Sequence, residues 1–156
     1  MAYRPVDVAW KIISIASQKN LNLTHMQLQK LTYIAHGLSL AGYKAPLLDQ
    51  PVSAWKFGPV IPSLYNEFKI YRSGFIPPKV LNVPMSKNDE NLLQLVVDTY
   101  GHLSGVQLSE LTHMTGTPWD QVWNRGGCNM SNAVISNELI QDYYQKMLQT
   151  QRCEGL

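Results

Sequence analysis

Charged residues are scarce in this sequence. Lys, Arg, Asp and Glu make up 15% of its 156 residues, whereas typical soluble domains contain about 25%. The formal net charge is only +2 and the cations form no long run, which argues against nucleic acid as a partner. A surface poor in charge is typical of a protein interface, but Asn, Gln, Ser and Thr in place of charges would give the same composition. Both interpretations stay open.

Cysteines and long apolar runs are also few. Cys128 and Cys153 are the only thiols and belong to no CxxC pair, so neither a disulfide framework nor a zinc site is indicated. No stretch approaches the ~18 apolar residues that span a membrane, and the first residues include no apolar leader segment. We therefore expect a cytoplasmic protein with reduced thiols and no membrane partner.

Recognisable catalytic motifs are missing as well. The four histidines, His25, His36, His102 and His113, form no HExxH pattern, and no glycine-rich phosphate loop occurs. The sequence thus predicts a binding protein that needs no cofactor or metal, and not an enzyme. Catalytic residues that converge from distant positions leave no motif, so an enzyme of unknown type is kept as an alternative.

Helix signals recur along the chain. Thr24 with Gln27 and Ser104 with Gln107 form capping boxes, and Thr117 precedes a proline and an acidic first turn. Apolar residues at helical spacing follow each signal. We expect helices over residues 5–20, 24–42, 61–72, 88–100, 104–113, 117–124 and 136–149.

Two segments between these helices are candidates for strands. Residues 43–60 contain three prolines that exclude a helix, and residues 54–57 are rich in aromatics. Residues 79–83 are the candidate for a partner strand that pairs near Trp55. The order of elements predicts a single compact, mostly α domain over residues 1–156, with its core at about 5–149. It should contain six or seven helices and at most a small β-hairpin.

The run over residues 55–60 is the most unusual in the sequence, since two aromatics and a lysine precede a glycine–proline turn. As a functional element it is a rigid docking loop, because aromatics dominate interface hot spots. As a structural element, Trp55 and Phe57 fill the core while the turn reverses the chain, and we favour this interpretation for Trp55. Lys56 does not fit a core position.

Residues 104–125 have the outline of a helix-turn-helix. A second helix that reads DNA would present Asp120 and Trp123, yet an acidic side chain would then face phosphates, whose contacts supply most non-specific affinity. We favour a helical corner packed through Trp119 and Trp123. A DNA-binding regulator that uses this segment is kept as an alternative function.

Polar residues flank the leucine stripe of the helix expected over residues 24–42. Lys30, Tyr33 and Gly37 share one face, with His36 at its margin. We favour a solvated flank beside the stripe, and the alternative is a contact face for a partner.

Three blocks follow one another at residues 26–37, 54–65 and 104–119. The first reads MQLQKLTYIAHG, the second reads AWKFGPVIPSLY, and the third combines SGVQLSELTH with GTPW. In this order they resemble the Panacea-domain family of antitoxins, which includes SocA-like and phage-associated GepA-like proteins. Two residues depart from the family pattern, because His36 stands where Gln is usual and Phe57 where Tyr is usual.

The resemblance implies a mostly helical antitoxin that binds a toxin encoded by a neighbouring gene through direct protein–protein contact. Toxins of the family belong to many unrelated classes, so the resemblance does not name the partner. SocA-like members also deliver their toxin to a protease, which makes a protease adaptor a further alternative.

We expect the partner to contact exposed side chains around two of these blocks, namely Lys30, Tyr33, Lys56 and Tyr65. Other motif residues are expected to form a framework that holds this surface in shape: Gln29, Trp55, Gly58, Pro59, Pro62, His113 and Trp119. No residue is assigned to catalysis or to a metal.

Overall fold

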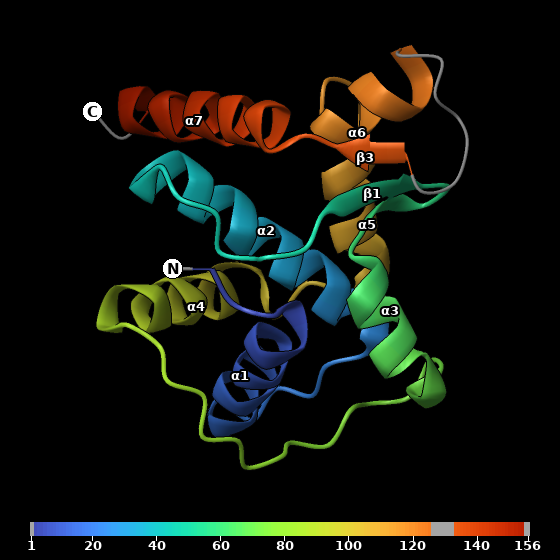
Figure 1. The fold of residues 1–156 in the computed structure, drawn as a ribbon, viewed down its shortest axis with the longest axis vertical. Helices are drawn as coiled ribbons and strands as arrows, with labels where there is room; N and C mark the ends of the chain where they lie inside the picture. Colours follow the sequence, from blue (N-terminus) through green and yellow to red (C-terminus); the bar gives the residue numbers. More distant parts are fainter. Residues whose placement is uncertain (1, 126–132, 155–156) are drawn as a thin grey trace.

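The computed structural model describes residues 2–125 and 133–154, which form seven α-helices and one small sheet (Figure 1). The helices are α1 (Pro5–Gln18), α2 (His25–Tyr43), α3 (Pro62–Phe68), α4 (Lys87–Tyr100), α5 (Gly105–His113), α6 (Pro118–Asp120) and α7 (Asn137–Glu154). A 3-10 turn, η1 (Lys69–Tyr71), extends α3, and a π-helical turn, η2 (Gln121–Arg125), extends α6. The predicted mostly α class is confirmed.

The predicted helix starts are accurate because each depends on neighbouring residues. The Thr24 hydroxyl accepts the Gln27 N–H at the start of α2, and the Gln27 side chain accepts the Thr24 N–H. The same reciprocal pair joins Ser104 and Gln107 at the start of α5. Each pair satisfies two backbone donors that the first helical turn would otherwise leave free.

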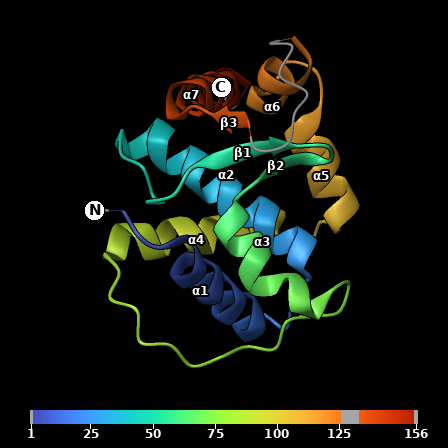
Figure 2. The ribbon, with the colours of Figure 1, turned by 45° about the vertical axis from the view of Figure 1, so that its right-hand side comes forward.

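Helix α2 lies at the centre of the molecule (Figures 1 and 2). α7 packs along one side of it, α1 and α4 along another, and α5 closes a third. Fifteen of its residues are therefore buried, and its apolar side chains belong to a core cluster that also draws on α1, α4 and α7. Residues 72–86 run across the outside of α1 before α4 begins (Figure 1).

The sheet has three antiparallel strands in the order β2-β1-β3, namely β1 (Val52–Trp55), β2 (Gly58–Val60) and β3 (Ala133–Ile135). Ser53 of β1 faces Val60 of β2 on one side and Val134 of β3 on the other. The hairpin β1–β2 crosses over α2 beside α3 and α5 (Figure 2). A strand near Trp55 was expected from the sequence, but its pairing with β2 and with β3 was not.

The predicted strand over residues 79–83 is wrong. The segment has no strand geometry, and Val80 is fully exposed. It passes along α1, where the Lys79 amine lies 5.4 Å from the centre of the Trp10 ring. The second side of β1 is taken by β3, so the pairing that we expected has no free edge to form on.

Candidate functional site

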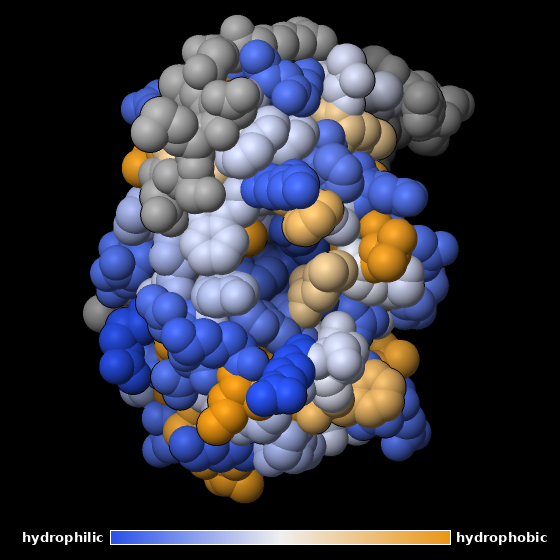
Figure 3. Space-filling view, turned by 90° about the vertical axis from the view of Figure 1, so that its right-hand side faces the viewer, coloured by the Kyte–Doolittle hydropathy of each residue, from blue (hydrophilic) through white to orange (hydrophobic). Residues whose placement is uncertain are grey.

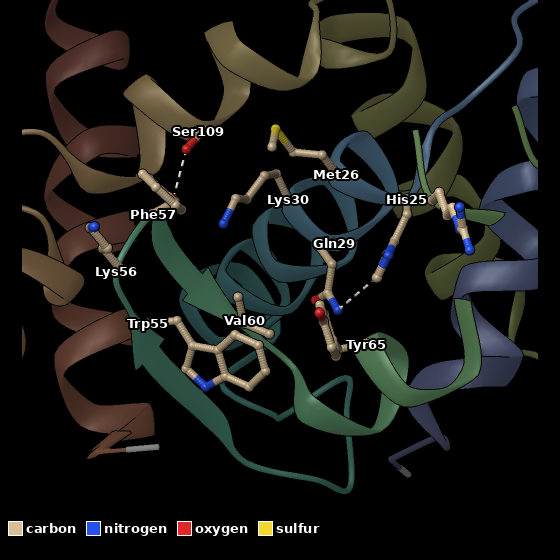
Figure 4. Close-up of a pocket in the computed structure, with 11 residues that line it drawn as sticks. His25, Met26, Gln29, Lys30, Trp55, Lys56, Phe57, Val60, Tyr65 and Ser109 are labelled. Carbon is tan, nitrogen blue, oxygen red and sulfur yellow. Dashed lines mark hydrogen bonds between the residues drawn. The ribbon is translucent and has the colours of Figure 1, made fainter. Parts of the chain in front are cut away.

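A cavity of about 360 Å³ opens between the first turns of α2, the β1–β2 hairpin, α3 and α5. Its volume lies at the lower end of the range of ligand pockets. Figure 3 shows that this face of the molecule is hollowed near its centre, with a hydrophilic floor and apolar atoms beside it. Eleven residues line the cavity: His25, Met26, Gln29, Lys30, Trp55, Lys56, Phe57, Val60, Tyr65, Arg72 and Ser109 (Figure 4).

Side chains from α5 and α6 hold the hairpin on one side. The indole N–H of Trp119 donates to the Trp55 carbonyl at 2.5 Å, and the Ser109 hydroxyl donates to the Phe57 carbonyl at 2.7 Å (Figure 4). The His113 ring packs edge-on against the Trp119 ring, with ring centres 5.3 Å apart. These contacts connect the third sequence block to the second.

Side chains from α2 hold the hairpin on the other side. The Lys30 ammonium donates to the Pro59 carbonyl at 2.8 Å. The Gln29 amide makes two bonds to Ile61, donating to its carbonyl at 3.2 Å and accepting its N–H at 3.0 Å. Because β2 is an edge strand, these side chains pair with backbone groups that no neighbouring strand can reach. Every second carbonyl from residue 55 to 61 thus accepts a side-chain hydrogen bond.

Gly58 is required by the turn of the hairpin. Its φ of +121° lies where residues with a side chain are strained. A Cβ atom at this position would also lie 2.9 Å from the Lys30 nitrogen. The missing side chain therefore lets the hairpin backbone pass directly over the lysine amine.

Lys30 is a buried cation at the floor of the cavity. Its exposed fraction is 3%, and burial lowers the pKa of its ammonium group to about 7. The burial disfavours the charged form because the low-dielectric surroundings replace water. Near neutral pH, Lys30 therefore responds to any charge that enters the cavity.

Aromatic rings form one wall of the cavity. Tyr65 lies edge-on to Trp55 at 4.9 Å and tilted against the His25 ring at 5.4 Å, measured between ring centres. Burial, with a smaller contribution from the Lys30 cation, lowers the pKa of His25. The wall therefore favours the neutral form of His25, and the Tyr65 side chain remains partly exposed.

Residues 28–120 match the family described as antitoxin SocA-like, Panacea domain. The match covers more than half of the chain and includes most of the residues that hold the hairpin. The chain belongs to the Panacea-domain family. The antitoxin SocA of Caulobacter vibrioides (strain NA1000 / CB15N) is 28% identical over 151 residues, which covers 88% of this chain and 80% of that relative. No solved structure matches this Panacea domain.

The Panacea domain exposes only two of the four residues that we expected to be exposed. Lys56 and Tyr65 lie at the surface as predicted. Lys30 and Tyr33, with 3% and 1% of their surface exposed, do not. The prediction was wrong for these two because it treated one flank of α2 as solvated, whereas the hairpin covers Lys30 and α7 covers Tyr33, whose ring lies 6.1 Å from the Tyr144 ring.

The expected framework residues gather around the hairpin. The hairpin itself contains Trp55, Gly58 and Pro59. Direct hydrogen bonds come from Gln29 to Ile61, directly after β2, and from Trp119 to Trp55. His113 acts through the Trp119 ring, against which it packs. Pro62 is the first residue of α3, directly after Ile61. Trp55 is only half-buried and Phe57 is 66% exposed, so the interpretation in which both fill the core is wrong for Phe57. The exposed tip of the hairpin is instead a rim of the cavity.

Several residues that line the cavity were not predicted from the sequence. His25 and Met26 precede Gln29 and Lys30 by four positions, so each pair occupies one face of α2. The capping box at Thr24 fixes where this helix begins. From that start, the sequence could have placed His25 and Met26 on the same faces as Gln29 and Lys30. No comparable signal marks Arg72, which arrives from the end of η1.

The segment over residues 104–125 forms the packed corner that we favoured. Trp119 and Asp120 are buried, with 5% and 6% of their surface exposed. The Asp120 carboxylate accepts the Gly116 N–H at 2.9 Å and the Asn124 amide N–H at 2.9 Å. These two side chains face inward, away from the position that a DNA-reading helix would need.

Among the side chains that the structure describes within residues 2–125 and 133–154, no three of His, Cys, Asp or Glu are placed to hold a metal ion. Cys128 lies outside the described residues. No helix in the same ranges combines the length and apolar character needed to cross a membrane.

Proposed function

We propose that this chain is the antitoxin of a toxin–antitoxin pair and that it neutralises a cognate protein toxin, encoded by a neighbouring gene, by direct binding. The observation that carries the proposal is the family match over residues 28–120. The relative in Caulobacter vibrioides is itself named as an antitoxin. Binding requires no cofactor and no catalytic step, and we place it in the cytoplasm.

The face around the cavity is the proposed contact surface. Three sequence blocks meet there, although they are separated along the chain. Its rim carries exposed Lys56, Phe57 and Tyr65, and aromatic side chains are enriched at the centres of protein interfaces. A stable complex of this kind buries about 1,600 Å² in total, so the cavity would be the centre of a larger interface.

Co-expression tests this function directly. The neighbouring open reading frame is expressed alone and together with this chain, and growth and co-purification are measured. We expect arrest of growth by the neighbour alone, normal growth with both, and a complex that survives purification. A neighbour that is toxic in both cases, or that is rescued without forming a complex, contradicts neutralisation by binding.

The DNA-binding and protease-adaptor hypotheses stay predictions. A salt-dependent mobility shift of the chain's own promoter DNA would support the first. Faster degradation of the toxin in the presence of this chain would support the second. Neither is favoured by a contact among the residues that the structure describes.

A further inference from the structure

The cavity has charged side chains of one sign. Lys30, Lys56 and Arg72 line it, and none of the described residues that line it is Asp or Glu. Within the described ranges, no carboxylate forms an ion pair with any of these three cations. A concave site lined by one sign of charge concentrates its field and attracts ions of the opposite sign.

Lys30 is the only buried one of these three cations. An ammonium group has three N–H donors, and the Pro59 carbonyl is its acceptor among the described residues. Buried charges in proteins are normally paired. Figure 4 shows the amine extending from α2 toward the hairpin, whose Pro59 carbonyl it contacts. Lys30 therefore borders the cavity with no carboxylate partner among the described residues.

We propose that the cavity binds a carboxylate side chain of the toxin, with the Lys30 ammonium as its ion-pair partner and with Lys56 and Arg72 attracting it at the rim. This inference rests on the proposed antitoxin function and adds the chemistry of the contact. The acceptor on the toxin is an Asp or Glu that enters the cavity from a projecting segment.

The apolar walls determine what surrounds that carboxylate. Met26, Trp55, Phe57 and Val60 line the cavity beside the cations, and Phe57 and Met26 are exposed at its opening. Such walls exclude water and strengthen an ion pair inside them. They also favour an acidic residue that has an apolar neighbour. The acidic side chain would then contact the cations while its neighbour contacts the apolar walls. We therefore expect the toxin segment to combine Asp or Glu with Leu, Ile, Met or Phe.

Binding of this kind should take up a proton. Burial holds the pKa of Lys30 at about 7 in the free protein, and a carboxylate beside the amine favours its charged form. The complex then contains more protonated lysine than the free protein. Affinity should consequently fall as the pH rises above about 7, and the fall should disappear when Lys30 is replaced.

A pair of peptides tests the site without knowledge of the toxin. Acetylated and amidated Gly-Leu-Glu-Leu-Gly is titrated into the 15N-labelled full chain beside the matched peptide with Gln in place of Glu. We expect the Glu peptide to bind about tenfold more tightly, as a charge-assisted pair requires. The perturbed signals should include the indole N–H of Trp55 and the amide of Phe57. Equal binding of both peptides, or shifts that avoid the cavity, overturns the proposal.

Lys30→Met and Lys87→Met are the matched variants. Lys87 is exposed at the start of α4, away from the cavity, and its replacement should keep the preference for the Glu peptide. Lys30→Met should remove this preference, and circular dichroism checks that it is folded. The comparison of the two peptides on the unaltered chain remains decisive if Lys30→Met does not fold. Sodium acetate that competes as well as the Glu peptide would indicate a small-anion site and also overturn the proposal.

The toxin complex separates this inference from the antitoxin function. If the unaltered chain neutralises the toxin and folded Lys30→Met does so with the same affinity, the carboxylate contact is excluded and the antitoxin function stands. If the unaltered chain does not neutralise its neighbour, the antitoxin function fails, and with it the toxin as the source of the carboxylate. Weaker binding by Lys30→Met, by about tenfold or more, together with normal binding by Lys87→Met, supports both.

Discussion

The two halves of α2 are both buried, yet they meet different surroundings. In the N-terminal half, Gln29 and Lys30 donate hydrogen bonds to the backbone of the hairpin and face a cavity. In the C-terminal half, Tyr33 and Gly37 are covered by α7, and the Tyr144 ring lies against both. One half of the helix therefore shapes a surface hollow, whereas the other half holds the fold together.

This difference shows that a buried polar side chain can contribute in two ways, through its hydrogen bonds or through its packing. Gln29 and Ile61 satisfy each other's amide groups, so the burial of Gln29 sets the position of the hairpin. The hydroxyl of Tyr33, in contrast, has no hydrogen-bond partner among the described residues, and its value to the protein lies in the packing of its ring. Variants in the two halves should consequently fail in different ways.

The largest expected effect is in the C-terminal half. Tyr144→Ala removes a ring that is 4% exposed and should lower the free energy of unfolding by about 3–5 kcal/mol, as for other large aromatic truncations. Urea denaturation measures this loss. Lys146→Ala, on an exposed position of the same helix, is the control and should change stability little.

Gly37→Ala tests the same contact from the α2 side. Its Cβ would lie 2.4 Å from Tyr144 ring carbons, so it should cost about 1–3 kcal/mol in the unaltered chain. In the Tyr144→Ala background this cost should shrink or vanish, because the clash is gone. Strictly additive effects would show that the close approach does not exist in solution.

In the N-terminal half, Gln29→Ala should destabilise the chain by about 1–3 kcal/mol. The substitution leaves the buried Ile61 N–H without its partner, whereas the Ile61 carbonyl keeps the N–H groups of Leu64 and Tyr65. A buried donor without a partner costs more than the loss of an exposed bond. Urea denaturation gives the magnitude, and backbone NMR shifts of residues 55–61 should change with it. A loss no larger than that of Gln18→Ala, at an exposed position of α1, would contradict this role.

Lys30 should make stability rise with pH. Its pKa is about 7 in the folded chain and near 10.5 when unfolded, so the unfolded state binds more protons between these values. The free energy of unfolding should therefore increase from about pH 7 to pH 9.5, by roughly 1 kcal/mol per pH unit. Below that range both states carry the proton and this contribution is constant.

Lys30→Met is the variant for this measurement. It should flatten the rise in stability between about pH 7 and pH 9.5, whatever its effect on stability at a single pH. Lys44→Met, at an exposed position after α2, should keep the rise. A slope that survives in Lys30→Met would assign the titration to another group.

His36 should also make the free energy of unfolding depend on pH, by less than Lys30 and in the acid range. It is 1% exposed, its Nδ1 accepts the Leu48 N–H at 3.2 Å, and its Nε2 lies 3.0 Å from the Asn137 side-chain oxygen. Burial lowers the pKa of His36, against a smaller raising effect of Asn137. The unfolded state therefore binds more protons as the pH falls below about 6.5, and stability should decrease there.

His36→Gln should reduce this loss of stability under acid, because the amide has no charged form. Thermal unfolding at about pH 7.5 and pH 5.5 measures it. His102→Gln, at an exposed position after α4, should leave the loss unchanged. Equal acid sensitivity of His36→Gln and the unaltered chain would remove His36 as its cause.

The smallest effect on stability is expected at the rim of the cavity. Lys56→Ala removes an exposed side chain and should change the free energy of unfolding by less than about 0.5 kcal/mol. It should nevertheless weaken binding to the toxin by about fivefold or more, as interface truncations do. Calorimetry of the complex measures the affinity, and normal binding by folded Lys56→Ala would sink the assignment.

Local features of this chain were predictable from its residues alone. The capping boxes at Thr24 and Ser104, the prolines that begin α1 and α3, and the glycine in the hairpin turn all act within a few positions. Such signals need no knowledge of the rest of the molecule. The motif residues that hold the hairpin, among them Gln29 and Trp119, were likewise identified before their contacts were known.

Contacts between distant segments could not be predicted from such local signals, because they depend on the tertiary structure. Val52 of β1 pairs with Ile135 of β3, about half of the chain away, and α7 covers Tyr33 from the C-terminal end. The periodicity of α2 indicates an apolar stripe, but it does not say how many neighbours will enclose the helix or that the hairpin will pass over Lys30. Periodicity describes one element, whereas burial depends on which other elements pack against it, and this choice made Lys30 the floor of a cavity instead of a solvated flank.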